Sequence, residues 1–167
     1  DAIELHNVTG ATVDISHWWL SDSASQPEKY RIPGGTTIAP FGFKVFYENQ
    51  FGIGPSGFSL NSAEGDDVYL SAGDANGQLT GQQGFVTFGP LRNGVSVGRY
   101  QTSRGIDFVP LSARTFGVDN PTGLIQFRTG TGLSNAAPGV GPIVISEFHF
   151  SPPGTPDVAD VDEFIEL

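Results

Sequence analysis

The sequence DAIEL (residues 1–5) returns at the end of the chain as EFIEL (residues 163–167). Each copy starts with an acidic residue and places Ile and Leu on either side of a Glu, which is the alternation of a half-buried β-strand. Solenoid repeats return every ~20–50 residues, so a repeat at nearly the full chain length indicates a domain-sized module. We therefore expect the chain to begin just inside one module and to end just inside the next.

Between these two stretches, short apolar bursts alternate with turns rich in Gly, Pro, Asn and Asp. The bursts predict strands at residues 2–6, 13–20, 30–33, 43–47, 67–70, 84–88, 95–100, 106–111, 143–150 and 163–167. Strands at regular spacing of about 8–12 residues favour an all-β sandwich or barrel. One alternative is a short helix over residues 156–164, which Thr155 would cap and Pro156 would begin.

Composition excludes several classes of protein. The chain has 8 basic against 18 acidic residues, a net charge of −10, and such a field repels nucleic acid. No apolar run approaches the ~20 residues of a membrane span. The absence of Cys excludes a disulfide framework and a cysteine nucleophile, and the absence of Met indicates a fragment or a processed product.

Several motifs, specific in combination, resemble the bacterial form of the lamin tail domain. They are IELHN (3–7), VDISHWWLSD (13–22), YRIPGGTTI (30–38), FSLN (58–61), GDDVYL (65–70) and GRY (98–100). The resemblance covers residues 1–111. Residues 143–167 resemble the opening strands of another copy, and residues 112–142 resemble the spacer between tandem copies in large secreted bacterial proteins.

This resemblance implies an immunoglobulin-like β-sandwich without catalytic residues. In such modules a strand like residues 143–150 comes first and a strand like residues 3–5 comes second, so the first strand is missing at the front and supplied at the back. A sheet without that strand exposes unpaired main-chain groups and apolar surface. We hypothesise that residues 143–150 fill the gap, in cis as a circular permutant or in trans as a swapped dimer.

Four carboxylates in a Pro-rich loop near the end of the chain form a candidate calcium site. They belong to Asp157, Asp160, Asp162 and Glu163. Ca²⁺ takes about 6–8 oxygen ligands, which a group of this density begins to supply. The spacing is not that of an EF-hand, and a solvated acidic loop is the alternative interpretation.

The second candidate surface is aromatic. Trp18 has the phase of a core residue, whereas Trp19 has the opposite phase and is a candidate for stacking on a sugar. The sequence contains no nucleophile elbow, phosphate loop or HExxH motif.

These observations favour a non-catalytic structural or interaction module of a large secreted or cell-surface bacterial protein. Its expected partners are other proteins or further copies of itself through strand exchange. The alternative is a calcium-dependent or carbohydrate-binding module, and an enzyme is the third choice. The net charge of −10 also argues against any nuclear or chromatin role for this chain.

Overall fold

The structure is a computed structural model that describes residues 1–117, 123–128, 131–139, 147–149 and 164–166. In chain order its elements are β1 (Ala2–His6), β2 (Val13–Asp14), β3 (Trp19–Ser21), β4 (Tyr30–Arg31), β5 (Thr37–Ile38), β6 (Phe43–Tyr47), α1 (Glu48–Phe51), β7 (Asp66–Gly73), β8 (Leu79–Phe88), β9 (Val97–Thr102), β10 (Gly105–Pro110), α2 (Leu124–Phe127), β11 (Glu147–His149) and β12 (Phe164–Glu166). Both helices are single turns, so the prediction of an all-β chain is confirmed.

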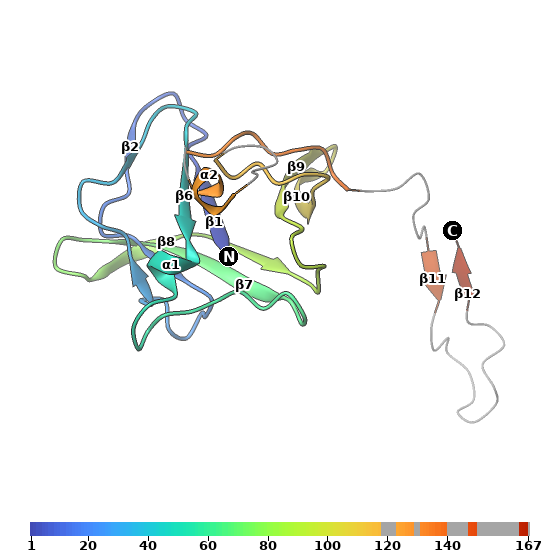
Figure 1. Ribbon diagram of the computed structural model, residues 1–167, viewed down its shortest axis with the longest axis horizontal. Coiled ribbons are helices and arrows are strands. Elements are labelled where there is room, and N and C mark those ends of the chain that lie inside the picture. The colour runs from blue at the N-terminus through green and yellow to red at the C-terminus, as the bar shows by residue number, and fades with distance from the viewer. Residues whose placement is uncertain (118–122, 129–130, 140–146, 150–163, 167) are drawn as a thin grey trace.

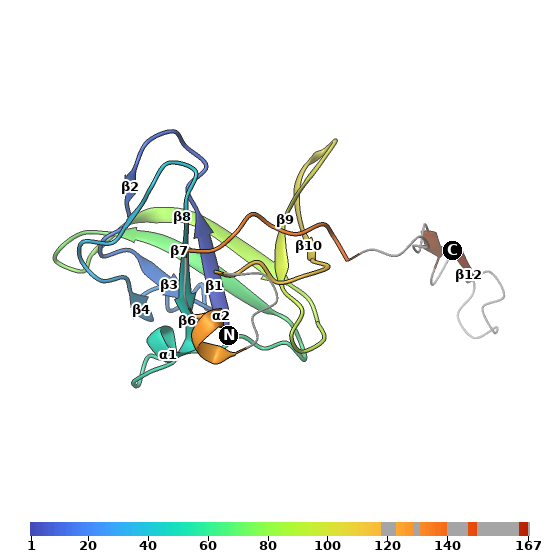
Figure 2. The same ribbon diagram turned by 45° about the horizontal axis from the view of Figure 1, so that its top comes forward.

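The strands form a sandwich. One layer is an antiparallel sheet in the order β4-β3-β7-β8, and the other is built from the pairs β1–β6 and β2–β5 (Figures 1 and 2). The core between the layers is a cluster of buried apolar side chains: Ile3, Ile15, Leu20, Ile32, Ile38, Phe46, Phe51 and Phe58. A separate hairpin, β9–β10, stands beside this sandwich.

Strand β1 uses only one of its edges. It pairs antiparallel with β6, and the pairing extends beyond β1, because the Asn7 N–H donates to the Gly42 carbonyl oxygen at 3.0 Å and the Glu48 N–H to that of Asp1 at 2.9 Å. Odd-numbered residues therefore bond to β6, and alternation sends the N–H and C=O groups of Ala2, Glu4 and His6 to the opposite edge. No strand in the described part of the chain pairs with that edge.

The segment between β6 and β7 contributes a core residue, Phe51. Residues 48–51 form one helical turn, and the Tyr47 N–H donates to Oε1 of Gln50 at 2.9 Å. This turn buries Phe51, whose ring stacks on Phe58 at a centroid distance of 4.7 Å. A single turn is too short to show a helical period, which is why the sequence did not reveal it.

Residues 74–77 form the turn of the β7–β8 connection. The Gly77 N–H donates to the Asp74 carbonyl oxygen at 3.0 Å, and Gly77 has φ +89°. Main-chain N–H groups, that of Gln78 above all, donate to the Asp74 carboxylate and lower its pKa. The acidic side chain therefore organises the hairpin.

Part of the predicted spacer packs on the sandwich. Leu111 and Pro138 form an antiparallel bridge, and the Leu133 N–H donates to the Thr115 carbonyl oxygen at 2.7 Å. Residues 131–139, which we call the return segment, reach from the region of α2 to the β9–β10 hairpin (Figure 1). The described residues of the spacer thus continue the fold.

The described C-terminal strands pair with each other. β11 pairs antiparallel with β12, in the register Glu147↔Glu166, Phe148↔Ile165 and His149↔Phe164. Neither strand pairs with β1 among the described residues, so the predicted permutation is not shown. Proximity favours the β11–β12 pair, because β12 lies much nearer to β11 in the sequence than β1 does, which lowers the entropy cost of closing the loop.

Candidate functional site: an apolar cleft along the open edge of β1

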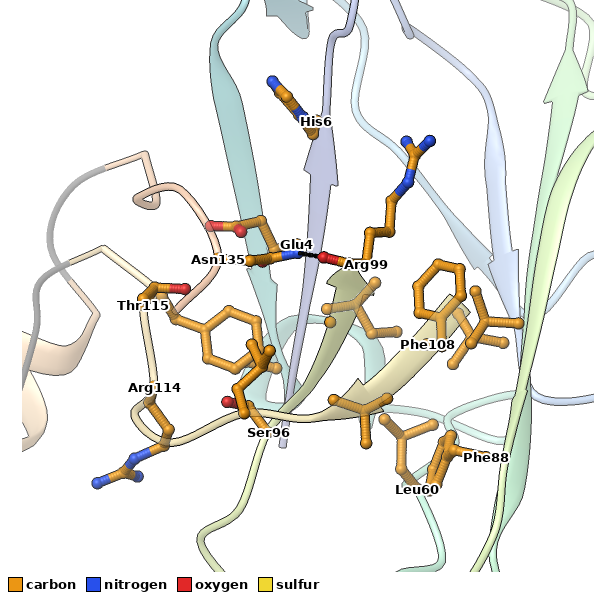
Figure 3. A pocket seen from close by; sticks show the side chains of 18 of the residues that line it. Glu4, His6, Leu60, Phe88, Ser96, Arg99, Phe108, Arg114, Thr115 and Asn135 are labelled. Carbon is orange, nitrogen blue, oxygen red and sulfur yellow. Dashed lines mark hydrogen bonds between the residues drawn. The ribbon is translucent and has the colours of Figure 1, made fainter. Parts of the chain in front are cut away.

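The unpaired edge of β1 borders a cleft of about 1080 Å³. The other walls come from β8, which is also the edge strand of its sheet, and from the β9–β10 hairpin (Figure 3). Its apolar lining includes Leu20, Leu60, Val68, Leu70, Val86, Phe88, Phe108 and Leu111. The sandwich is therefore open along one side, where the edges of both sheets meet.

Several large apolar side chains of the cleft are exposed to solvent. Phe108 on β10, which projects into the cleft toward β8, is 41% exposed. Ile106 and Val95 lie at the same cleft and are also exposed. Contiguous apolar surface of this kind marks a binding site more often than single exposed residues do.

Two buried polar atoms at the cleft have no hydrogen-bond partner among the described residues. They are Oε2 of Glu4 and Oγ of Ser96. Ser96 is itself buried, and its carbonyl oxygen accepts from the Leu111 N–H at 2.9 Å, whereas its hydroxyl has no partner among the described residues. An unpaired buried polar group destabilises the free protein.

Glu4 is the most perturbed titratable group of the site. Its carboxylate lies against Gly132 of the return segment, which covers this face of β1. Burial disfavours the charged form and raises the pKa of Glu4 to about 8. The side chain is consequently neutral over much of the physiological pH range.

The mouth of the cleft carries Arg99 and Arg114. The carbonyl oxygen of Arg99 accepts a hydrogen bond from Nδ2 of Asn135 at 3.0 Å, which fixes the return segment to β9. An open strand edge, an apolar floor and a charged rim together suit an extended polypeptide.

The predicted calcium ligands, Asp157, Asp160, Asp162 and Glu163, lie outside the described residues. Their role therefore stays a prediction. Within the part of the chain that the structure describes, no group of three or more His, Asp or Glu side chains is placed to hold a metal ion.

Trp19 lies on β3 and is partly buried. The Arg31 guanidinium lies over its ring, 5.8 Å from the centroid, and is held there by the carbonyl oxygens of Asp74 and Ala75, each 2.9 Å from Nη2. Stacking on a sugar at this face would have to displace Arg31, and the predicted ligand surface at Trp19 stays a prediction. Trp18, as expected, packs against the core.

Sequence reasoning did not single out Glu4, Ser96 or Phe108. The available signal for Glu4 was its repetition as Glu166, because the two five-residue copies share Ile, Glu and Leu in the same order. Ser96 and Phe108 gave no local signal, since their importance arises where β9 and β10 meet β1 and β8.

In the described part of the chain, neither helix has the length and apolar character that a membrane crossing requires. No curated protein and no solved structure matches the chain. The family model of the Lamin Tail Domain matches residues 1–86, more than half of the sequence and most of the sandwich. The chain therefore belongs to the lamin tail domain family of immunoglobulin-like structural and interaction domains.

Proposed function

We propose that this chain is a non-catalytic interaction module that accepts a β-strand of another polypeptide along the open edge of β1. The observation that carries the proposal is the coincidence of that edge with an apolar cleft of about 1080 Å³. Strand addition needs main-chain partners for affinity and pockets for alternate side chains for specificity. β1 offers the former through Ala2, Glu4 and His6, and the cleft offers the latter.

The proposed setting is a large secreted or cell-surface bacterial protein with several such modules. It is supported by the return of DAIEL as EFIEL nearly one chain length later. The strand would come from another module or from another protein that carries a similar strand. Calcium binding and glycan binding rest on the sequence alone, and calorimetric calcium titration and a glycan array test them.

A labelled peptide with the sequence of residues 143–150 and two added lysines for solubility tests the proposal. Titrated with the full chain, it should bind and show increased fluorescence anisotropy. Phe108→Asp places a charge in the cleft and should weaken binding at least tenfold. Phe41→Asp is the matched control, because Phe41 is 64% exposed and does not line the cleft.

Equal binding by the wild type and Phe108→Asp would contradict the proposal. Circular dichroism and thermal melting of both variants confirm that each is folded before the comparison is made.

A further inference from the structure

The pairing of β11 with β12 indicates how a strand could pair with the open edge of β1. β12 reproduces part of β1, since aligning EFIEL with DAIEL places Phe164 on Ala2, Ile165 on Ile3 and Glu166 on Glu4. The structure fixes how β11 lies on β12. Transferred to β1 through this alignment, that register specifies which residues would face each other.

We infer that β12 is an intramolecular stand-in for β1, and that β11 can leave it to pair with β1 of a second copy, with Glu147 opposite Glu4, Phe148 opposite Ile3 and His149 opposite Ala2. This inference rests on the proposed function, and it names the partner and the element that restrains it. β12 keeps the donor strand paired within its own chain.

The proposed register of β11 on β1 places an apolar side chain on the buried face of β1. Directly opposed residues of an antiparallel pair lie on the same face of the sheet. Ile3 is buried and borders the cleft, so Phe148 opposite it would enter the apolar side of the sandwich. His149 and Glu147 would oppose Ala2 and Glu4, the residues whose main-chain groups point to the open edge.

The present partner of β11 holds it weakly. The β11–β12 ribbon consists of three residue pairs in a two-stranded sheet, and an isolated two-stranded ribbon is marginally stable in water. On β1 the donor would instead extend a sheet that is already packed on a core.

Tethering favours β12. Intramolecular tethering corresponds to an effective concentration on the order of millimolar, so exchange should become detectable at about 0.1–1 mM protein. Reciprocal exchange closes a swapped dimer, whereas one-way exchange leaves a further donor and acceptor and produces a chain of copies. Both forms contain the same strand pair.

Disulfide trapping detects the pair of β11 with β1 of a second copy directly, because the chain has no Cys of its own. Ala2→Cys and His149→Cys chains, one of them isotope-labelled, are mixed and oxidised, and the joined peptides are identified by mass spectrometry. Opposed residues of antiparallel strands have Cα atoms about 4.5–5.5 Å apart, within the range of a disulfide. We expect a crosslink between labelled and unlabelled chains.

Ala2→Cys mixed with Glu147→Cys is the register control, displaced by two residues, and should crosslink at least tenfold less. Equal yields in the two mixtures, or no mixed crosslink at 1 mM, would overturn the inference.

A reversible lock tests the role of β12. The double variant Glu147→Cys with Glu166→Cys joins the pair seen in the structure and should hold β11 on β12. The oxidised form should associate at least tenfold less than the reduced form of the same protein, as measured by light scattering. Equal association of the two forms would overturn the role of β12. If the peptide of residues 143–150 still binds the cleft, the proposed function stands without it.

Discussion

Nδ2 of Asn7 donates a hydrogen bond to the carbonyl oxygen of Ile38 at 3.1 Å, and thereby ties the turn after β1 to β5. The same nitrogen lies 2.7 Å from the carbonyl oxygen of Ala11 and 2.9 Å from that of Ala39. Its Oδ1 accepts from the N–H and the hydroxyl of Thr9. A buried side chain thus connects two turns of the β1 layer at the end of the open edge.

Replacing Asn7 should therefore destabilise the domain. Asn7→Ala leaves buried carbonyl oxygens without a donor, and we expect the free energy of unfolding to fall by about 2–4 kcal/mol. Urea denaturation measures it. Asn76→Ala, in the exposed β7–β8 turn, is the control and should change stability by less than about 0.5 kcal/mol. Equal effects of the two substitutions would show that the buried network does not hold the turns.

Gly65 permits the close approach of β7 to the end of β8. It has φ +90°, and an added Cβ would collide with the carbonyl oxygen of Phe88. Gly65→Ala should lower the unfolding free energy by about 2–4 kcal/mol in a denaturant titration, through positive-φ strain and displaced main chain. Gly89→Ala is the nearby control, since no atom lies within 4 Å of its added Cβ, and it should be neutral or slightly stabilising. A tolerated Gly65→Ala would contradict the observed strand approach.

Two buried serines should respond to truncation with opposite signs. Ser96 Oγ has no partner among the described residues, so Ser96→Ala removes an unsatisfied hydroxyl and should stabilise the chain by about 1 kcal/mol. Ser21 Oγ donates to the carbonyl oxygen of Gln26 at 2.7 Å and accepts from the Ser23 N–H, so Ser21→Ala should destabilise by about 1–3 kcal/mol. The melting temperatures of the two variants and of the wild type measure these effects. Destabilisation by both substitutions would show that the Ser96 hydroxyl has a structural partner.

Burial of Glu4 predicts a pH dependence of stability. Its pKa rises from 4.5 to about 8 on folding, so between these values the folded chain binds the extra proton. Stability is then full below about pH 4.5 and declines as the pH rises through 8. The full conversion is about 1.4 kcal/mol per pKa unit, and partial exposure reduces the expected decline to about 1–3 kcal/mol in total.

Glu4→Gln tests this assignment, because it keeps the shape and removes the titration. Urea denaturation of both proteins between pH 5 and 9 gives two curves whose difference isolates Glu4 from the histidines. As the pH rises, the unfolding free energy of Glu4→Gln should increase relative to that of the wild type. Parallel curves would contradict the buried carboxylic acid.

The sequence predicted those parts of the fold that depend on local pattern. Alternation around Ile3 and Leu5 predicted β1, because that signal lies within a few residues. Phe51 was missed because one helical turn has no period to detect. The cleft could not be predicted from the sequence, because the strands that form it, β1, β8, β9 and β10, are far apart in the sequence.

The β11–β12 pair shows a different limit. The return of DAIEL as EFIEL relates β12 to β1 in sequence, yet it could not decide with which copy β11 would pair. That choice depends on loop closure and on the packing surface behind each strand, which are properties of the folded chain.

Amide hydrogen exchange by NMR, recorded over a series of protein concentrations, tests the strand-accepting edge most directly. The N–H groups of Glu4 and His6 point to the open edge, whereas those of Ile3 and Leu5 bond to β6. Our account predicts that Glu4 and His6 exchange rapidly in dilute protein and become protected at millimolar concentration or with the peptide of residues 143–150. Ile3 and Leu5 should be protected throughout. Rapid exchange of Glu4 and His6 under all of these conditions would contradict it.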